Sequence, residues 1–335
     1  MRLPRLSIGL WKKAVFTKLK TSRLIKGVIA ATILLFVSIS QDTLVQSNGG
    51  YSDAPSIDYK NPNWMSGVSG TLRLSELSLP GTHDSLSFHG GSWVQTQSIP
   101  LKTQLESGVR VFDIRARHIE NIFTIHHGSV YQKTDFGRVM VSMTEFLENN
   151  PSEAILIRVK QEYKAKNTTR SFEDTFEWYE KKYQNYIWKP TSQNPTLNEV
   201  RGKIVILQDF ATTSPFKFGL HYRKFDIQDN WSLDCFKTPS QNLSKKWTNI
   251  KNHIKKAKNG DINLIYINYL SAVGGGPCIT LITPSYVAKR TNEQTLAYIR
   301  NGKINFTGII MADFPGADLI NQIIKLNRHR GEMPI

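Results

Sequence analysis

Short apolar runs alternate with helix-like patterns along most of this chain, and that alternation limits the possible folds more than any other feature. Seven runs have the length and composition of β-strands: Leu74–Leu79, Arg110–Ile114, Phe123–His126, Ala154–Val159, Lys203–Leu207, Asn263–Ile267 and Gly308–Met311. Five segments carry apolar residues at helical spacing: Val139–Asn149, Ser171–Tyr183, Lys245–Lys258, Gln294–Asn301 and Asp318–Leu326. Interleaved strands and helices favour a parallel α/β fold, and the number of strands predicts a single, distorted TIM-type (β/α) barrel.

The N-terminal region has the order of charge and hydropathy that is typical of an export signal. Residues 1–41 hold eight basic residues and no acidic residue, and residues 28–39 form an almost unbroken apolar run. That run is shorter than the roughly 20 residues of a membrane-spanning helix, whereas the basic leader is long for a cleaved signal. We therefore expect export, with the protein either secreted or tethered to the outer face of the membrane by residues 27–40.

Three regions follow from these patterns. Residues 1–41 are the basic leader with its apolar signal or anchor, residues 42–63 are a linker, and residues 64–335 are one barrel domain. The net charge of +16 favours anionic partners, although half of the excess lies in the leader. Cys235 and Cys278 are the only cysteines, so the chain has either one disulfide or two free thiols.

Charged side chains follow the carboxyl ends of five predicted strands. They are His83 and Asp84 after the first run, Asp113 and Arg115 at the second, His127 after the third, Lys160 after the fourth and Asp313 after the last. In a parallel barrel these strand ends meet at one face, which is where active sites lie. A packed core gains nothing from charges there unless each is paired. We therefore expect these side chains to converge in one site.

Two histidines, several carboxylates and an arginine are sufficient to cleave a phosphodiester without a metal ion if the substrate has a hydroxyl group beside its phosphate. One imidazole removes the hydroxyl proton and the other protonates the departing alcohol, each contributing typically about 10²- to 10⁴-fold. The guanidinium of Arg115 can stabilise the charge that develops on the phosphoryl oxygens. The simpler interpretation of Arg115 is a buried ion pair with Asp113 alone.

Three motifs resemble the signature of bacterial-type phosphatidylinositol-specific phospholipase C, a family of phosphodiesterases with a PLC X-type domain. They are Pro80-Gly81-Thr82-His83-Asp84, Asp113-Ile114-Arg115 and His126-His127-Gly128, and Met311-Ala312-Asp313-Phe314 adds a fourth. The resemblance extends from about Trp64 to Asn327. It implies a phosphoric diester hydrolase or lyase that cleaves phosphatidylinositol to diacylglycerol and inositol 1,2-cyclic phosphate, followed by slower hydrolysis of the cyclic product.

The resemblance also implies roles for a catalytic set, namely His83, Asp84, Asp113, Arg115, His127 and Asp313. In this set His83 would be the general base, oriented by Asp313. His127 would be the general acid, supported by Asp84, because the family's acid directly precedes a glycine. Arg115 would bind the phosphate, with Asp113 beside it.

Substrate-binding and membrane-binding positions are implied by the same resemblance. Lys160 and Asp229 would contact the inositol ring, and the flat apolar face of Trp231 would stack on it. Trp93 is expected at the membrane interface. Some members carry a basic ring-binding residue after the strand Lys203–Leu207, where this chain has Gln208-Asp209, and we expect this difference to affect substrate preference.

No cofactor or metal ion is expected, because a guanidinium at Arg115 would repel a calcium ion bound at the phosphate. The expected partners are membranes that contain phosphatidylinositol, with glycosylphosphatidylinositol anchors left open, and the protein is expected to be a monomer. Nucleic acid is not expected, because the chain has no recognition motif for it. Two alternatives are a catalytically inactive inositol-lipid binding module and a glycerophosphodiester phosphodiesterase-like enzyme, whose metal-binding Glu-x-Asp is missing at Asp113-Ile114-Arg115.

Overall fold

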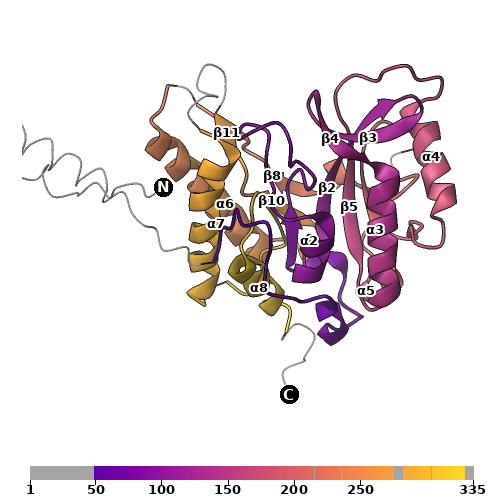
Figure 1. The fold of residues 1–335 in the computed structure, drawn as a ribbon. Coiled ribbons are helices and arrows are strands. Elements are labelled where there is room, and N and C mark those ends of the chain that lie inside the picture. The colour runs from indigo at the N-terminus through magenta and orange to yellow at the C-terminus, as the bar shows by residue number, and fades with distance from the viewer. Residues whose placement is uncertain (1–48, 215, 235, 275–281, 303, 329–335) are drawn as a thin grey trace, which may run out of the picture. The chain divides into compact units, whose positions relative to one another are not determined.

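A curled parallel sheet of eight strands forms the centre of the fold (Figure 1). The strands follow the order β7-β6-β5-β2-β1-β12-β10-β8, and every neighbouring pair is parallel. Their bounds are β1 (Leu79–Thr82), β2 (Val111–Ile119), β5 (Ile155–Gln161), β6 (Ile204–Asp209), β7 (Leu220–His221), β8 (Asp226–Gln228), β10 (Tyr266–Tyr269) and β12 (Ile309–Ala312). No ladder joins β7 to β8 within the described part of the chain. The expected distorted (β/α) barrel is thus confirmed, in an open form.

The structure is a computed structural model, and it describes residues 49–328 apart from 215, 235, 275–281 and 303. The expected leader and both cysteines lie outside these residues, so the predictions for them stay predictions. Among the residues that are described, no helix is both long and apolar enough to cross a membrane.

Side chains that alternate along the strands separate the barrel interior from the layer under the helices. The interior cluster includes Leu79, Val111, Leu156, Val205, Leu207, Ile267, Ile309 and Met311. The residues between them face outward and pack against helices, as Ile114 and Ile157 do on one side and Ile310 on the other. Every second residue of a strand faces the barrel interior. At the carboxyl ends of the strands, the residues that face this way are 83, 113, 115, 158, 160, 209 and 313.

Seven α-helices in the described residues cover the sheet (Figure 1). They are α2 (Leu101–Ser107), α3 (Phe136–Asn149), α4 (Phe172–Lys182), α5 (Leu197–Val200), α6 (Pro239–Asn259), α7 (Pro284–Arg300) and α8 (Ala317–Lys325). Helices α6 and α7 begin earlier than predicted, because Thr238 and Thr283 cap them and a proline follows each cap. The first turn of α6 is polar, so hydrophobic spacing alone does not reveal where that helix begins. A small parallel pair, β9 (Ser232–Leu233) and β11 (Val273–Gly274), lies outside the main sheet.

The third predicted strand is not a parallel barrel strand. It is β3 (Ile122–His127), which turns back antiparallel on the end of β2 and continues antiparallel into β4 (Val130–Asp135). The turn is made by Glu120 and Asn121, both with positive φ, as a tight two-residue hairpin requires. His127 therefore reaches the barrel mouth on a hairpin that extends β2.

The first predicted strand begins later than expected. Leu74–Glu76 forms a short 3-10 helix, and the strand starts only at Leu79. Leu74 and Leu77 are both buried and are three residues apart, which is the repeat of a 3-10 turn rather than of a strand. The glycine of the motif, Gly81, faces the interior, where a Cβ atom would clash with the sulfur of Met311.

Part of the expected linker contacts the barrel. Tyr51 is buried against Phe314, and the backbone nitrogens of Gly50 and Tyr51 both donate to Oε1 of Glu293 on α7. Two further short 3-10 helices, η1 (Trp64–Gly67) and η3 (Tyr222–Lys224), complete the described elements.

A buried ion pair beneath the barrel gives a test of the fold. Arg110 and Glu153 are both fully buried, with Nη2 of Arg110 2.7 Å from Oε2 of Glu153. We expect Glu153→Gln to lower the free energy of unfolding by roughly 3–5 kcal/mol, because it leaves the guanidinium without its charge partner. The matched control is Glu106→Gln, which breaks the exposed pair with Lys60 and should cost at most about 1 kcal/mol. Urea unfolding measures both; equal losses in the two variants would contradict the prediction.

Candidate active site

His83 lies at the end of β1, next to the end of β12. Thr82 pairs with Ala312 in the parallel ladder, so the following residues, His83 and Asp313, leave the sheet side by side. Nδ1 of His83 is 2.8 Å from Oδ1 of Asp313, whose carboxyl is almost fully buried. Nδ1 therefore carries the proton, and Nε2 keeps the lone pair that a general base needs. Burial raises the pKa of Asp313, while the positive charge of a protonated His83 opposes that shift. This carboxyl is thus placed to stabilise the imidazolium that forms when His83 accepts a proton.

Arg115 follows Asp113 by two residues on the inward face of β2. Its Nε atom is 3.3 Å from Oδ2 of Asp113, Nη1 is 3.3 Å from Oδ2 of Asp84, and Nη2 is 2.7 Å from Nε2 of His83. Burial alone would lower the pKa of Arg115, but the charges of Asp84 and Asp113 raise it. Arg115 thus forms the expected ion pair with Asp113. It also lines a cavity, where it supplies a fixed positive charge.

Asp113 is buried behind this guanidinium. Burial would raise its pKa, but the positive charges of Arg158 and Arg115 hold the pKa well below its usual range. Its carboxylate therefore stays ionised and fixes the orientation of Arg115.

His127 faces the same cavity from the β3 hairpin. Its Nδ1 atom is 2.9 Å from Oδ2 of Asp84 and 3.1 Å from Oγ of Ser87. Burial alone would lower the pKa of His127, yet the hydrogen bond and charge of Asp84 raise it. Asp84 itself has a φ of 41°, a left-handed conformation that non-glycine residues seldom adopt. This backbone lets one buried carboxylate contact both His127 and Arg115.

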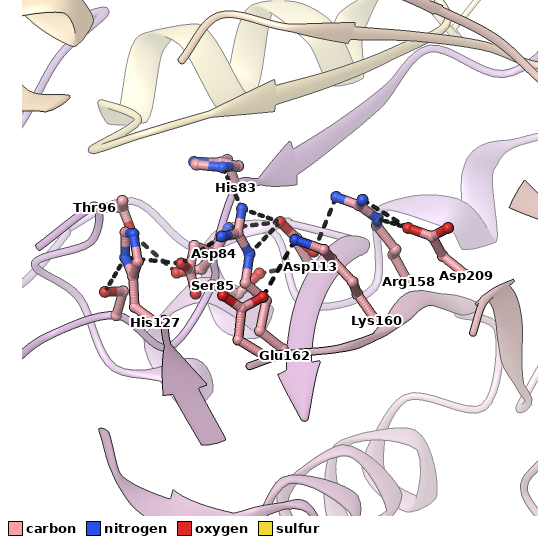
Figure 2. A network of polar contacts seen from close by, with 12 residues as sticks. His83, Asp84, Ser85, Thr96, Asp113, His127, Arg158, Lys160, Glu162 and Asp209 are labelled. Atoms are coloured by element: carbon pink, nitrogen blue, oxygen red, sulfur yellow. Dashed lines mark hydrogen bonds and ion pairs between the residues drawn. The ribbon is translucent and has the colours of Figure 1, made fainter. Parts of the chain in front are cut away.

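The contacts join into one continuous network across the barrel mouth (Figure 2). The order is His127, Asp84, Arg115, Asp113, Arg158 and Asp209, with His83 attached through Arg115. Positive and negative groups alternate along it, so each buried charge has a neighbour of opposite sign. The network holds the side chains in place before any ligand binds.

A cavity of about 320 Å³ opens above this network. His83, Arg115, His127 and Asp313 line it, and Asp84 and Asp113 lie behind them.

The residues implied for substrate and membrane binding also line the cavity: Lys160, Asp229, Trp231 and Trp93. Lys160 is 3.2 Å from Glu162, whereas the Trp231 side chain is mostly exposed. The structure thus brings every residue of the predicted site to one end of the barrel.

The neighbouring histidine, His126, does not line the cavity. It is buried on the opposite face of the hairpin, where its Nδ1 atom is 3.2 Å from Oγ1 of Thr124 and its ring contacts Tyr131. Burial lowers the pKa of His126, in contrast to that of His127. The alternation of side chains in β3 separates the two histidines.

Sequence reasoning missed Arg158 and Tyr269. Arg158 lines the cavity from β5, and the hydroxyl group of Tyr269 on β10 accepts a hydrogen bond of 3.1 Å from Arg158 Nη1. Asp209, at the place where a basic residue was expected, is bonded to Arg158. The signal that could have found Arg158 is the two-residue period of β5, which places it on the same face as Lys160.

No group of three or more histidine, cysteine, aspartate or glutamate side chains in the described part of the chain has the arrangement of a metal site. The centre of the site instead presents the guanidinium of Arg115 next to an imidazole nitrogen.

Comparison with known proteins finds consistent relatives. A family model described as "Phosphatidylinositol-specific phospholipase C, X domain" matches residues 74–209. A 1-phosphatidylinositol phosphodiesterase of Listeria monocytogenes is 32% identical over 79% of this chain and 84% of the relative. The enzyme of that name from Staphylococcus aureus is 32% identical over 88% of this chain and 98% of the relative. The solved structure of the Listeria phosphatidylinositol-specific phospholipase C matches with a TM-score of 0.69 at 32% identity, covering 80% of this chain and 99% of that structure.

Proposed function

Because this chain belongs to the phosphatidylinositol-specific phospholipase C family, we propose that it cleaves phosphatidylinositol to diacylglycerol and inositol 1,2-cyclic phosphate. It is an enzyme of the phospholipase C type. The observation that carries the proposal is the pair of cavity-lining imidazoles, each with its own carboxylate, and a fixed guanidinium in contact with both halves of the site.

The reaction is an internal displacement at phosphorus. Nε2 of His83 accepts the proton of the inositol 2-hydroxyl group, and the oxygen attacks the phosphorus to close the cyclic diester. The bond to the glycerol oxygen breaks, and His127 gives that oxygen its proton, which releases diacylglycerol. Arg115 stabilises the charge on the phosphoryl oxygens. Hydrolysis of the cyclic product uses the same groups in reverse, with water as the attacking molecule.

The choice of His127 as the acid makes a direct prediction. We expect His127→Ala to lower kcat by about 10²- to 10⁴-fold, the usual range for a lost general acid. His126→Ala should retain most of the activity, because His126 is buried away from the cavity. Steady-state turnover of phosphatidylinositol measures both variants. Loss in His126→Ala with retention in His127→Ala would reverse the assignment.

The raised pKa of His127 sets the basic limb of the pH profile. His127 must be protonated to act, so the raised pKa keeps the enzyme active to higher pH. We expect Asp84→Asn to shift the basic limb of kcat/KM to lower pH, because the stabilising carboxylate charge is lost. Ser87→Ala, which removes an uncharged neighbour of the same nitrogen, should shift it less. A basic limb that stays in place in Asp84→Asn would show that His127 is not the acid.

Three cavity-lining residues are proposed to bind the inositol ring. Lys160 and Asp229 supply a donor and an acceptor for ring hydroxyl groups, and Trp231 supplies a flat apolar face. Trp93 is about one-third exposed at the same opening and is proposed to contact the lipid surface.

The reaction is proposed to need no metal ion, because Arg115 already occupies the place of the charge-stabilising group. The proposed partner is a membrane that contains phosphatidylinositol. Export is proposed from the basic leader and the apolar run at residues 28–39, with the enzyme acting outside the cell as a monomer.

Phosphorus NMR of the protein with phosphatidylinositol vesicles and excess chelator tests the proposal. The expected result is a cyclic 1,2-phosphate signal that rises first and is replaced slowly by inositol phosphate. A silent spectrum with intact vesicle binding would favour an inactive binding module. Activity that is abolished by chelator and restored by calcium would overturn the metal-independent reaction.

A further inference from the structure

Arg158 is a cavity-lining arginine that none of the steps above uses. It lies on β5, two residues before Lys160, and its side chain is 11% exposed. The guanidinium lies over the ring of Tyr222, at 4.4 Å from the ring centre. A buried charge held this firmly requires either a structural or a ligand-binding explanation.

Four of the five N–H groups of Arg158 are satisfied by the protein. Nε and Nη2 donate to Oδ2 of Asp209 at 3.0 and 2.7 Å, and Nη1 donates to Oδ1 of Asp113 and to the hydroxyl group of Tyr269 at 3.4 and 3.1 Å. Within the described residues no acceptor takes the second N–H of Nη2. One N–H donor therefore remains available on a side chain that lines the cavity.

The position of Arg158 in the network indicates which part of the substrate its side chain contacts. His127 protonates the glycerol oxygen, so the lipid leaves on the His127 side. Arg158 lies with Asp209 at the opposite end of the network, beyond Asp113 (Figure 2). The inositol ring must therefore occupy the side of the cavity where Arg158 is found.

Asp209 explains how the arginine is held there. In the ladder Arg158 pairs with Leu207, so Asp209 is one inward-facing position further along β6 and accepts two of its N–H groups from the neighbouring strand. The acidic residue at this place thus holds a basic group from β5 at the same end of the cavity. Both N–H groups converge on one oxygen, Oδ2 of Asp209, so the guanidinium is held to this carboxylate at two of its nitrogens.

We propose that Arg158 determines specificity for the inositol ring by donating its remaining N–H to a ring hydroxyl group, and that Asp209 is the positioning residue for Arg158. This inference rests on the proposed function, because the ring side is defined by the leaving lipid. The chemistry recognised is a polyhydroxylated ring and not the phosphate, which Arg115 holds.

The test combines turnover of phosphatidylinositol with binding of myo-inositol alone. We expect Arg158→Met to raise the KM, and to weaken inhibition by myo-inositol, by roughly 10- to 100-fold, the range for a hydrogen bond to a charged donor. The value of kcat should fall much less. Asp209→Asn should act in the same direction with a smaller change. Unchanged KM and inhibition with a large loss of kcat would overturn the proposal, because Arg158 would then act only through Asp113.

Rescue and control variants separate this role from a structural one. The exchange Arg158→Asp with Asp209→Arg keeps the ion pair and returns a guanidinium to the cavity from β6, so it should recover part of the myo-inositol affinity lost in Arg158→Met. Arg223→Met is the control, since Arg223 also contacts Asp209 but is mostly exposed and does not line the cavity. It should leave KM and inhibition unchanged. No recovery in the exchange variant, with thermal stability intact, would contradict the role of Asp209.

Arg158→Lys keeps a charge at the site if Arg158→Met does not fold, and it should show an intermediate loss of myo-inositol affinity because the fork of N–H groups is gone. Wild-type affinity in Arg158→Lys would overturn the role of the guanidinium. Saturation-transfer NMR with myo-inositol needs no turnover. A wild-type protein that binds myo-inositol through Arg158 but leaves phosphatidylinositol intact would thus refute the proposed function while supporting this inference.

Discussion

His83→Ala lowers kcat/KM for phosphatidylinositol by about 10²- to 10⁴-fold, according to the site geometry. His83 is the imidazole whose Nδ1 is held by Asp313, so its Nε2 is the nitrogen prepared to accept a proton. Its removal also takes away the contact with Nη2 of Arg115, and the expected loss therefore lies toward the upper end of that range. The measurement is the initial rate of diacylglycerol release from vesicles.

Two further readouts show that the loss is chemical and not structural. The His83 side chain is partly exposed at the cavity, so the thermal midpoint of His83→Ala should stay close to that of the wild type. Added imidazole should restore part of the rate, because it supplies a base to the space left by the side chain. A variant that keeps more than a tenth of wild-type activity would remove His83 from the mechanism.

Arg115→Lys is expected to lower kcat by about 10²- to 10³-fold, the effect of removing one donor that stabilises an oxyanion. Lysine keeps the charge but cannot reproduce a planar fork that contacts Asp84, Asp113 and His83 together. The KM should change little, since the lost interaction strengthens only as charge develops on the phosphoryl oxygens.

The matched control for Arg115 lies two residues further along β2. Arg117 donates to the backbone oxygen of Lys164 and stacks on Tyr163, away from the cavity. Arg117→Lys should therefore leave kcat within about twofold of the wild type. It should also cost little stability, as is usual for surface substitutions of this kind. Equal effects of the two substitutions would contradict the assigned role of Arg115.

The family and the barrel could be predicted from the sequence because the informative residues lie at strand ends. The motif around His83 and the one around Arg115 each follow an apolar run, and parallel strands bring their ends together without any further information. The family match and the structure confirm both the resemblance and the fold.

Other features depend on tertiary contacts that a linear pattern does not contain. The tight turn at Glu120 and Asn121 makes β3 antiparallel to β2. An apolar run alone does not distinguish a parallel strand from an antiparallel one. In the sequence, Arg158 is one residue of an apolar strand. Its partner Asp209 lies on the neighbouring strand β6, and only the folded structure brings the two together. The start of α6 could not be predicted from hydrophobic periodicity, because the first turn is polar. The feature that marks it is the cap at Thr238.

In the proposed mechanism the inositol 2-hydroxyl group is the nucleophile and His83 is its base. The most direct measurement is turnover of phosphatidylinositol in which that hydroxyl group is methylated, compared with the unmodified lipid in the same vesicles. We expect no release of diacylglycerol from the methylated lipid, because its 2-oxygen has no proton for His83 to accept. The methylated lipid should still compete with the unmodified lipid for the site. Release at a rate near that of the unmodified lipid would mean that water attacks phosphorus directly, and would contradict the mechanism.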